Sequence, residues 1–312
     1  MKILIVCSYR EYSAHTDYVA PFIYEQVQSL EKQMCETRYV IIKGGGVKAY
    51  IRGALNLIRI AKKWQPDIIH AHSGFCGFIA NLQRSVPVVT TYHGSDINVD
   101  LNRFISRFAI HFSAYNIFVS QKLIDLVNPK RKYTCIPCGV DLDRFYSIED
   151  KNACREKLNL TLNRKYVLFS KMFCDPVKNY ALARRAINKL HGVELIEFVG
   201  YSREASCLLM NACDAVIMTS FMEGSPQFIK EAMACSCPIV SVDVGDVKEI
   251  ISGTKACFVT SYDAADIADK LQQALDFEGR TDGRSRIMQF DTNEQAKKII
   301  DIYNSITRNK HS

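Results

Sequence analysis

Short runs of apolar and β-branched residues alternate along the chain with longer segments in which apolar residues recur every three or four positions. The short runs predict buried strands and the longer segments predict amphipathic helices, an alternation typical of a parallel α/β sheet. In the first half of the chain, strands are predicted at residues 2–7, 37–42, 68–71, 86–91, 116–119 and 133–136. In the second half, strands are predicted at residues 166–170, 194–199, 215–218, 238–242 and 256–259. Helices are predicted between them, among others at residues 18–31, 49–64, 179–190, 202–211, 226–235 and 264–275.

A polar stretch at residues 141–152 separates the two series of strands and is interpreted as a linker. The length of 312 residues also favours two domains, since a domain usually has about 100–200 residues. We therefore predict two doubly wound, Rossmann-like domains that face each other across a cleft, with ligands at the carboxyl ends of the strands. The predicted limits are residues 1–146, residues 147–290, and residues 291–312 for a C-terminal helix that packs back toward the first domain.

Composition excludes several classes of protein. With 48% hydrophobic and 23% charged residues, the chain is globular rather than disordered. No apolar run approaches the roughly 18 residues of a membrane-spanning helix, and the run at residues 3–7 is too short for a signal-peptide core. The protein is therefore expected in the cytoplasm, with its 12 cysteines reduced. The Cys135/Cys138 and Cys235/Cys237 pairs lack the partners of a zinc site, so buried structural thiols are expected there.

The net charge of +7 indicates an anionic partner without choosing among nucleotide, nucleic acid and lipid. Three motifs that would decide the matter are missing. No G-x-G-x-x-G follows the first strand, no G-x-x-x-x-G-K-[ST] occurs, and no G-x-S-x-G occurs. A standard dinucleotide fold, a phosphate-loop ATPase and an α/β-hydrolase are therefore not indicated.

The strongest local signal is the segment from Glu223 to Glu231. Ser225 is a good N-cap and Pro226 suits the first helical position, so a helix is predicted to start there. The amide groups at such a helix start form an anion site. Glu231 then falls about one and a half turns into the helix, where a carboxylate can accept hydrogen bonds from the two vicinal hydroxyls of a ribose. The alternative is an exposed helix glutamate and a loop glutamate, which the spacing alone favours.

The same segment carries a family resemblance. Glu223 and Glu231 form an E-x7-E pair, followed by Ala-Met-Ala-Cys-Ser-Cys-Pro-Ile-Val and by Asp243-Val-Gly-Asp246. Further matches in the same order are Pro66-Asp67-Ile-Ile-His-Ala-His72, Tyr92-His93-Gly-Ser-Asp96, Ile136-Pro-Cys-Gly-Val-Asp141 and Lys178-Asn179. Over nearly its whole length the chain resembles the retaining glycosyltransferases of family 4, which have the two-domain GT-B fold. It is most similar to bacterial members that build cell-surface polysaccharides.

The resemblance implies a role for each matching residue. Glu231 would hold the nucleotide ribose and Glu223 the hydroxyls of the donor sugar. Lys178 and Lys171 would lie on the donor diphosphate, and His93 would face the sugar near its sixth carbon. The turn Gly224-Ser225-Pro226 would add backbone amides to the diphosphate site. Fixed cations and helix-end amides suit this chemistry, because the leaving diphosphate gains charge as the glycosidic bond breaks.

The implied activity is the transfer of a hexosyl or N-acetylhexosaminyl group from a nucleotide diphosphate-sugar, a UDP-sugar, to a glycan or polyprenyl-linked glycan. The resemblance implies a front-face reaction, in which the departing phosphate oxygen takes the proton of the acceptor hydroxyl. Two departures from the family keep one alternative open, a catalytically inactive GT-B subunit that binds a nucleotide sugar or a partner transferase. Lys171 stands where the family usually has Arg, and residues 8–15 lack a glycine pair. A second alternative is a sugar-nucleotide epimerase, which shares the two-domain architecture, although the E-x7-E pair and the Ile-Pro-x-Gly-Val-Asp segment argue against it.

No metal or other cofactor is expected. His70, His72 and His93 have no H-E-x-x-H or accompanying carboxylate pattern, so they are interpreted as strand-end and cleft residues. The D-x-D triplet at Asp141 and Asp143 resembles a metal–diphosphate motif, but it belongs to the Gly-Val-Asp linker and is rejected.

A basic stripe is the last feature. Between Thr37 and Pro66 there are seven Lys and Arg residues and no acidic residue. At about 100° per residue, five of them share one arc of the predicted helix, opposite an apolar side that ends at Trp64. These five are Lys48, Arg52, Arg59, Lys62 and Lys63. The stripe is either a solvated face or a docking site for an anionic membrane, which would place the protein on the inner face of the plasma membrane. Nucleic acid is not expected, since no stacking platform accompanies the stripe.

Overall fold

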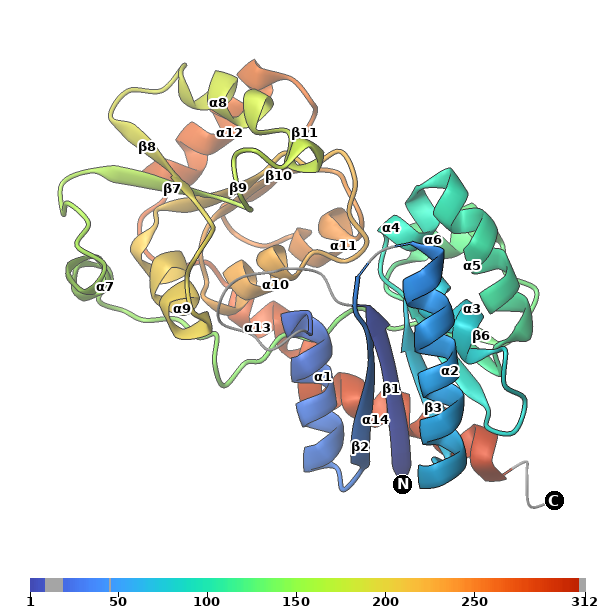
Figure 1. The fold of residues 1–312 in the computed structure, drawn as a ribbon. Helices are drawn as coiled ribbons and strands as arrows, with labels where there is room; N and C mark the ends of the chain where they lie inside the picture. Colours follow the sequence, from blue (N-terminus) through green and yellow to red (C-terminus); the bar gives the residue numbers. More distant parts are fainter. Residues whose placement is uncertain (9–18, 45, 309–312) are drawn as a thin grey trace. The chain divides into compact units, whose positions relative to one another are not determined.

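The structure is a computed structural model of the chain and describes residues 1–8, 19–44 and 46–308. The chain divides into two compact units (Figure 1). The first unit consists of Met1–Gly139 and Thr292–Ser312, and the second of Val140–Asp291. Among the described residues, no helix is long and apolar enough to cross a membrane.

The first unit is built on a six-stranded parallel sheet in the order β2-β1-β3-β4-β5-β6. Its strands are β1 (Lys2–Ser8), β2 (Glu36–Ile42), β3 (Ile68–His72), β4 (Val88–Tyr92), β5 (Tyr115–Phe118) and β6 (Tyr133–Cys135). All residues of β3 and β4 are buried, as expected where helices cover both faces of a parallel sheet.

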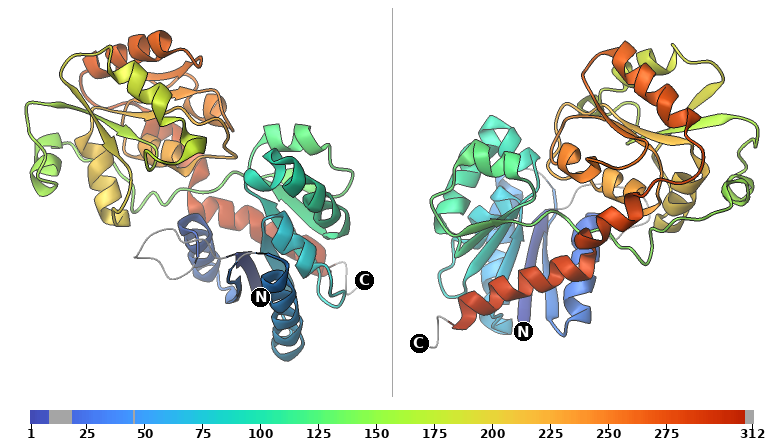
Figure 2. Two further views of the ribbon diagram at one scale, coloured as in Figure 1. Left: turned by 45° about the horizontal axis from the view of Figure 1, so that its top comes forward. Right: turned by 180° about the vertical axis from the view of Figure 1, so that it is seen from behind.

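Helices form a layer on each face of this sheet. On one face, α1 (Pro21–Lys32) packs beside α14 (Thr292–Arg308), and both share an apolar cluster with β1 (Figure 2). On the other face, α2 (Val47–Trp64) and α3 (Gly74–Ala80) pack together, and α5 (Asp100–Phe112) packs against α3. The short helices α4 (Ser95–Asn98) and α6 (Gln121–Val127) follow β4 and β5.

The second unit is built on a five-stranded parallel sheet in the order β11-β10-β9-β7-β8. Its strands are β7 (Lys165–Phe169), β8 (Val193–Glu197), β9 (Ala215–Met218), β10 (Ile239–Val242) and β11 (Cys257–Thr260). Helices α8 (Tyr180–Ile187) and α12 (Ala264–Asp276) pack together, and α9 (Arg203–Ala212), α10 (Gln227–Ala234) and α13 (Gly283–Ile287) form a second group. The remaining elements are α7 (Lys151–Lys157), α11 (Val247–Ile251), and the 3₁₀ turns η1 (Pro176–Lys178) and η2 (Met288–Phe290).

The two sheets share one connectivity. Each begins with the order 2-1-3-4-5, counted from the first strand of its own unit, which is a doubly wound arrangement. In such a sheet the second strand is added on one side of the first strand and the later strands on the other side. The loops at the carboxyl ends of the first and third strands therefore diverge at one point. That point lies between β1 and β3 in the first unit and between β7 and β9 in the second.

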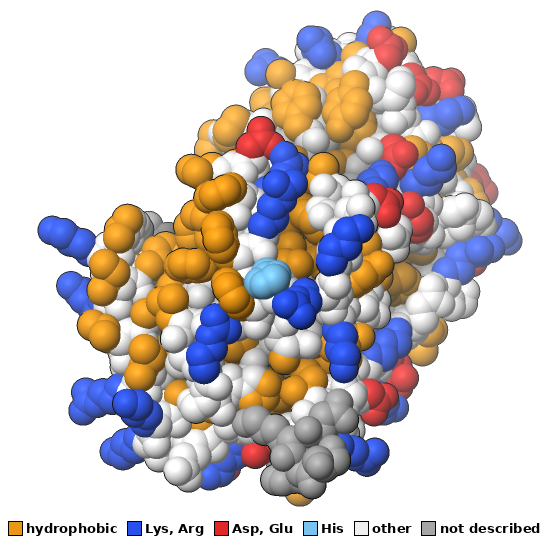
Figure 3. All heavy atoms as spheres, turned by 90° about the vertical axis from the view of Figure 1, so that its right-hand side faces the viewer, with side chains coloured by type: hydrophobic (Ala, Val, Ile, Leu, Met, Phe, Trp, Pro, Cys, Tyr) orange, Lys and Arg blue, Asp and Glu red, His pale blue; other side chains and the backbone are white. Residues whose placement is uncertain are grey.

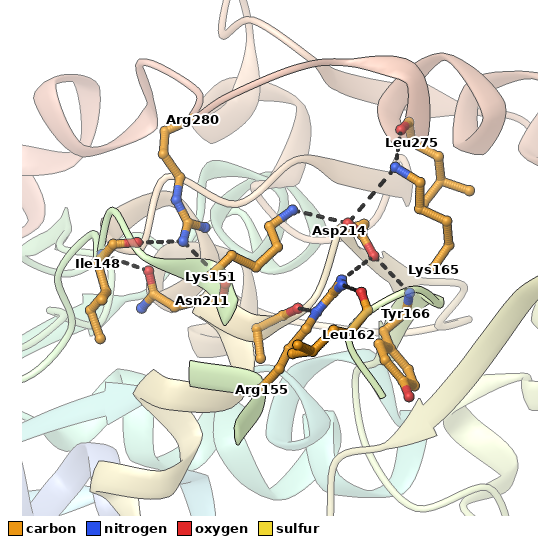
Figure 4. Close-up of polar contacts among 11 residues, drawn as sticks. Ile148, Lys151, Arg155, Leu162, Lys165, Tyr166, Asn211, Asp214, Leu275 and Arg280 are labelled. Carbon is orange, nitrogen blue, oxygen red and sulfur yellow. Dashed lines mark hydrogen bonds and ion pairs between the residues drawn. The ribbon is translucent and has the colours of Figure 1, made fainter. Parts of the chain in front are cut away.

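A buried polar cluster ties α7 to the second sheet (Figure 4). The Asp214 carboxylate accepts from Arg155 at 2.8 Å, from Lys151 at 2.9 Å and from the backbone N–H of Tyr166 at 2.8 Å. In the same cluster, Asn211 accepts from the backbone N–H of Ile148 at 2.8 Å. Because Asp214 and Arg155 are both nearly inaccessible, removing one partner would leave an uncompensated buried charge.

The boundary between the units differs from the predicted one. The first stretch of the first unit ends at Gly139, whereas the sequence pattern predicts residues 140–146 in the first domain. Leu142 and Phe145 belong to the apolar core of the second unit, so this polar stretch is not a free linker. Asp141 accepts the backbone N–H groups of Asp143 and Arg144, each at 3.1 Å, so the D-x-D triplet forms a turn.

The predicted α/β class with two Rossmann-like parallel sheets is confirmed. All eleven predicted strands are present, and no end differs by more than two residues from its prediction. The cysteine prediction is partly wrong. None of the twelve cysteines, all of which are described, forms a disulfide, and eight are buried, but Cys135 at the end of β6 is exposed.

The close packing of α3 gives a test of the fold. A Cβ atom on Gly77 would meet Thr90 Cγ2 and Oγ1, each at 2.6 Å. Replacing Gly by Ala inside a helix normally raises the stability of the protein by up to about 1 kcal/mol. Forcing an extra methyl group into a packed interior lowers it by about 1–3 kcal/mol. Gly77→Ala is therefore expected to lower the free energy of unfolding in urea. Gly53→Ala on α2, whose new methyl group would meet Ile42 at 3.0 Å, should cost less. Equal or higher stability of Gly77→Ala would contradict this packing.

Candidate functional site

The main polar constellation lies where β7 and β9 end in the second unit. Most of the residues predicted from the E-x7-E segment are here, on the loop of residues 219–226 and on α10. Three buried polar atoms around this edge have no hydrogen-bond partner among the described residues: the hydroxyls of Ser170 and Ser220, and Oδ1 of Asp246. Buried polar groups are normally satisfied, so this edge retains hydrogen-bonding capacity for a ligand.

Lys178 and Glu223 form an ion pair, and each side chain is only 15% exposed. Lys178 ends the 3₁₀ turn η1, which Asp175 caps by accepting the backbone N–H of Val177 at 3.0 Å. The hydroxyl of Thr219, just after β9, donates to the carbonyl oxygen of Lys178 at 3.0 Å. The end of β9 therefore holds both the backbone of Lys178 and the loop that carries Glu223.

Lys171 lies two residues beyond the end of β7, and its ammonium group is 3.8 Å from Asp175. The same aspartate therefore contacts Lys171 and caps the turn that carries Lys178. The two predicted diphosphate cations are linked through one carboxylate.

Ser225 does not cap α10 as predicted. The helix begins at Gln227, its N-cap is Pro226, and no side chain accepts a hydrogen bond from the helix start. The hydroxyl of Ser225 instead donates to Asp246 and accepts from Lys230 Nζ at 2.6 Å. The serine hydroxyl therefore bonds two charged side chains instead of the helix start, and these side chains come close to it only in the folded chain.

Lys230 is a site residue that the sequence reasoning missed. Its side chain is fully buried and also donates to the carbonyl oxygen of Ser225 at 3.1 Å. Burial raises the pKa of the Asp246 carboxyl, and the Lys230 ammonium acts in the opposite direction. A lysine on an amphipathic helix is usually solvated, so spacing gives no signal that this one is internal.

The turn at Gly224 is packed against a second loop. Gly245 has a φ of +58°, and a Cβ atom there would lie 2.6 Å from the carbonyl oxygen of Gly224. Only glycine meets both the left-handed backbone conformation and the close approach. The Asp243-Val-Gly-Asp246 segment therefore supports the turn between Glu223 and Ser225.

Glu231 is buried, with its side chain 3% exposed, and pairs with Arg203 at 2.7 Å. This burial contradicts the alternative of an exposed helix glutamate. Arg203 is the first residue of α9, whose N-cap Ser202 accepts the backbone N–H of Ala205 at 3.1 Å. The guanidinium group also lies 4.6 Å from the centre of the Phe145 ring. Sequence reasoning missed Arg203, which no motif marks.

His93 belongs to the first unit and lies just after β4. Asp96 accepts the backbone N–H of His93 at 3.1 Å and that of Gly94 at 2.8 Å, which fixes this turn. The His93 ring packs on Phe22 with ring centres 4.8 Å apart, and its Nε2 is 3.0 Å from Nδ1 of His72. A buried neighbour therefore fixes the orientation of this imidazole.

His72, which contacts His93, stacks on a second buried histidine, His70. Their rings stack at 4.5 Å, and His70 lies 2.5 Å from the Tyr303 hydroxyl on α14 and 2.7 Å from that of Thr91. Burial lowers the pKa of His70 to about 3 and that of His72 well below its usual value. Both imidazoles are therefore neutral near pH 7. No group of three or more metal-ligating side chains occurs within the part of the chain that the structure describes.

Helix α2 carries the basic stripe on its outer face. Lys48, Arg52, Arg59 and Lys63 are exposed, whereas Leu57 and Trp64 are buried against the sheet. The predicted residues thus fall into separate groups: those predicted to bind the donor lie in the second unit, and His93 and the stripe lie in the first. The predicted glycine-poor loop at residues 8–15 falls almost entirely outside the described residues.

Comparison with known proteins decides the family. The sequence model of Glycosyltransferase Family 4 matches residues 24–144, and that of Glycosyl transferases group 1 matches residues 175–276. This chain is a family 4 glycosyltransferase with the GT-B fold.

Among relatives of this glycosyltransferase is a Bacillus subtilis protein named as a teichuronic acid biosynthesis glycosyltransferase, TuaC. It is 25% identical, over 78% of this chain and 72% of the relative. Sucrose-phosphate synthase from Thermosynechococcus elongatus has the same fold, with a TM-score of 0.80, 14% identity, and 97% and 98% of the two chains covered. HepE from Anabaena, solved with UDP and glucose, superimposes with a TM-score of 0.72 and 16% identity, over 98% of this chain and 100% of HepE.

The buried histidines predict an acid-sensitive first unit in this glycosyltransferase. Below a pH of about 6.5 the unfolded chain binds protons at His70 and His72 that the folded chain does not, so stability falls as the pH falls. The free energy of unfolding should decrease in both proteins when the pH is lowered from 7.5 to 5.5. In His70→Gln this decrease should be smaller than in the wild type by about 1.4 kcal/mol. Urea unfolding at both pH values measures this, with His191→Gln, an exposed histidine, as the control. An identical loss in His70→Gln and the wild type would disprove the prediction.

Proposed function

We propose that this glycosyltransferase is a retaining enzyme that transfers a hexosyl or N-acetylhexosaminyl group from a UDP-sugar to a glycan or polyprenyl-linked glycan during surface polysaccharide synthesis. The observation that carries the proposal is the pair of buried carboxylates on one loop–helix segment, Glu223 beside Lys178 and Glu231 beside Arg203. The name of the TuaC relative supports the polysaccharide assignment, and HepE with bound UDP and glucose supports the donor class.

The donor is proposed to lie along this segment. Glu231 would accept hydrogen bonds from the ribose hydroxyls, and Glu223 from hydroxyls of the sugar. The diphosphate would then lie between them, at Lys178 and the first amide groups of α10. These groups suit the reaction, because fixed cations and helix-end amides stabilise charge on the leaving diphosphate. Lys171 would add a second cation from the end of β7.

The proposed step is a front-face displacement. The bond between the anomeric carbon and the phosphate oxygen breaks, and that oxygen takes the proton of the acceptor hydroxyl. The acceptor oxygen then bonds to the anomeric carbon on the same face, so configuration is retained. His93, oriented by His72, is proposed to contact the donor sugar. No cofactor enters this scheme, since lysine and amide groups supply the positive charge that a metal ion would otherwise supply.

One observation favours a second candidate, a GT-B subunit that binds the nucleotide sugar without turning it over. Lys171 stands where the family usually has Arg, and a lysine cannot make a bidentate phosphate contact. Measuring sugar release from a UDP-sugar with and without acceptor separates the candidates, because an inactive subunit would bind the donor and leave it intact. Conversion to an epimeric UDP-sugar would instead identify an epimerase.

The ribose assignment is tested at Glu231. Glu231→Gln keeps the shape of the side chain but removes the charge that strengthens the ribose hydrogen bonds. UDP binding should weaken by about 1–3 kcal/mol, the scale of hydrogen bonds to a charged group. Calorimetry measures the affinity, and Glu278→Gln, an exposed glutamate of the same unit, is the control. Wild-type affinity in Glu231→Gln would refute the assignment.

The diphosphate assignment is tested at Lys178. Lys178→Ala should lower kcat by a factor of about 10²–10³, as when other charge-stabilising groups are lost. Lys178→Arg should retain part of the activity. The control is Lys189→Ala, which replaces an exposed lysine of the same β7–β8 connection and should retain full activity. Activity should also persist in excess EDTA. Loss of activity on chelation, restored by Mg²⁺ or Mn²⁺, would show that a metal rather than lysine neutralises the diphosphate.

A further inference from the structure

The outer layer of α2, α3 and α5 leaves many large apolar side chains in solvent. Ten such residues lie between positions 47 and 112. They are Val47, Ile51, Leu55, Phe78, Leu82, Val99, Leu101, Phe104, Phe108 and Phe112. Scattered apolar residues are normal on a protein surface, but a concentration over neighbouring helices marks a surface that another body covers.

The aromatic members of this layer touch one another. Phe104 and Phe108 on α5 are 5.4 Å apart between ring centres, and Phe108 is 6.2 Å from Phe78 on α3. Farther along the layer, Phe75 on α3 lies 5.3 Å from Tyr50 on α2. The layer is therefore continuous from α5 through α3 to α2.

Helix α5 presents its phenylalanines to solvent and small residues to α3. The buried residues are Ser106, Ala109 and Ile110, whereas Leu101 and Phe104 are 70% and 60% exposed. Ser106 and Ala109 are small because α5 lies close to α3 at these positions. A Cβ atom on Gly74 would collide with the side chain of Ser106. The aromatic side chains thus cannot be part of the core of this unit.

Positive charge accompanies the apolar layer. From position 37 to position 95 there are eight Lys and Arg residues and a single acidic residue, Asp67. Arg107 is exposed on α5, and the Arg84 guanidinium lies 4.5 Å from the centre of the Phe112 ring. Figure 3 shows apolar side chains gathered on this side of the molecule, with Lys and Arg side chains around and among them.

We propose that the α2–α3–α5 face docks on an anionic lipid membrane, with Leu101, Phe104 and Phe108 inserted at the boundary between headgroups and acyl chains. The basic residues of α2, together with Arg84 and Arg107, then contact the lipid phosphates. Interfacial binding needs an apolar face flanked by Lys and Arg, and each basic residue at the surface adds to the attraction. A purely electrostatic site would leave the phenylalanines unexplained, and a purely apolar interface would leave the charge unexplained. The proposal rests on the proposed function in one respect, the lipid-linked acceptor.

Vesicle flotation of the full chain tests the two components separately. The wild type should bind vesicles of phosphatidylcholine and phosphatidylglycerol at low salt and bind pure phosphatidylcholine weakly. Replacing Phe104 and Phe108 together by Gln should reduce binding at least tenfold, whereas Tyr24→Gln, an exposed aromatic residue of α1, should not change it. Replacing Arg52, Arg59 and Lys63 by Gln should abolish binding at low salt. Failure of the wild type to bind, or unchanged binding of the Phe104/Phe108 variant, would overturn the proposal.

Insertion itself is measured by fluorescence. The only tryptophan of the chain, Trp64, is buried, so Phe104→Trp adds an exposed reporter. Its emission should shift to the blue on adding anionic vesicles and be quenched by lipids brominated on the acyl chains. Tyr24→Trp, the matched control, should show neither change. A Phe104→Trp reporter that binds vesicles but stays unquenched would disprove insertion.

Two further measurements separate this proposal from its competitors. If the face instead joins two copies of the chain, the wild type will sediment as a dimer and the Phe104/Phe108 variant as a monomer, which would overturn membrane docking. UDP affinity should be equal in the wild type and in both docking variants. Membrane binding without UDP binding would refute the proposed function and leave the docking proposal standing.

Discussion

The geometry of the loop at residues 219–226 depends on one buried cation. The ammonium group of Lys230 has no access to solvent and donates to both the hydroxyl and the carbonyl oxygen of Ser225. Removing an ammonium ion from water costs several kcal/mol unless charged and polar partners replace the water. Asp246, which accepts from Ser225, completes this replacement. The lysine on α10 therefore fixes the turn before its own helix and ties it to the loop after β10.

This constraint decides what the segment presents to a ligand. With Ser225 used internally, the groups left at the edge of the sheet are Glu223 with Lys178 on one side and Glu231 with Arg203 on the other. Each carboxylate is paired with a cation, so each is held at a fixed place. Such preorganisation matters in group transfer, where stabilising groups should not have to move as charge develops on the leaving group.

In the first unit, neutral rather than charged buried groups hold a side chain in place. The buried imidazoles of this unit connect the Tyr303 hydroxyl on α14 with the ring of His93 through direct contacts. A C-terminal helix distant in sequence thereby helps to order the carboxyl ends of β3 and β4. On the other face of this sheet, the helices pack through glycine and small residues, which leaves the phenylalanines of α5 outside.

Much of this arrangement can be predicted from the sequence. The alternation of apolar runs and amphipathic segments determines the strands and the parallel class, because burial on both faces requires continuous apolar strands. The E-x7-E segment and its neighbours indicate the family and place Glu223 and Glu231 on one loop and helix. The charge pattern of α2 follows from helical periodicity, since residues three and four apart share a face.

Only the tertiary structure decided which polar groups meet. The local sequence predicts Ser225 as a helix cap, because capping is a local preference. In the folded chain its hydroxyl instead forms hydrogen bonds with two charged side chains, Lys230 and Asp246. Arg203 meets Glu231 through the packing of α9 beside α10, and no local pattern encodes that contact. In α5 the spacing of Phe104, Phe108 and Phe112 is that of an ordinary core stripe, which periodicity cannot distinguish from an exposed one. Where α3 approaches α5 there is room only for the small residues Ser106 and Ala109, and this steric limit keeps the aromatic stripe on the outer side.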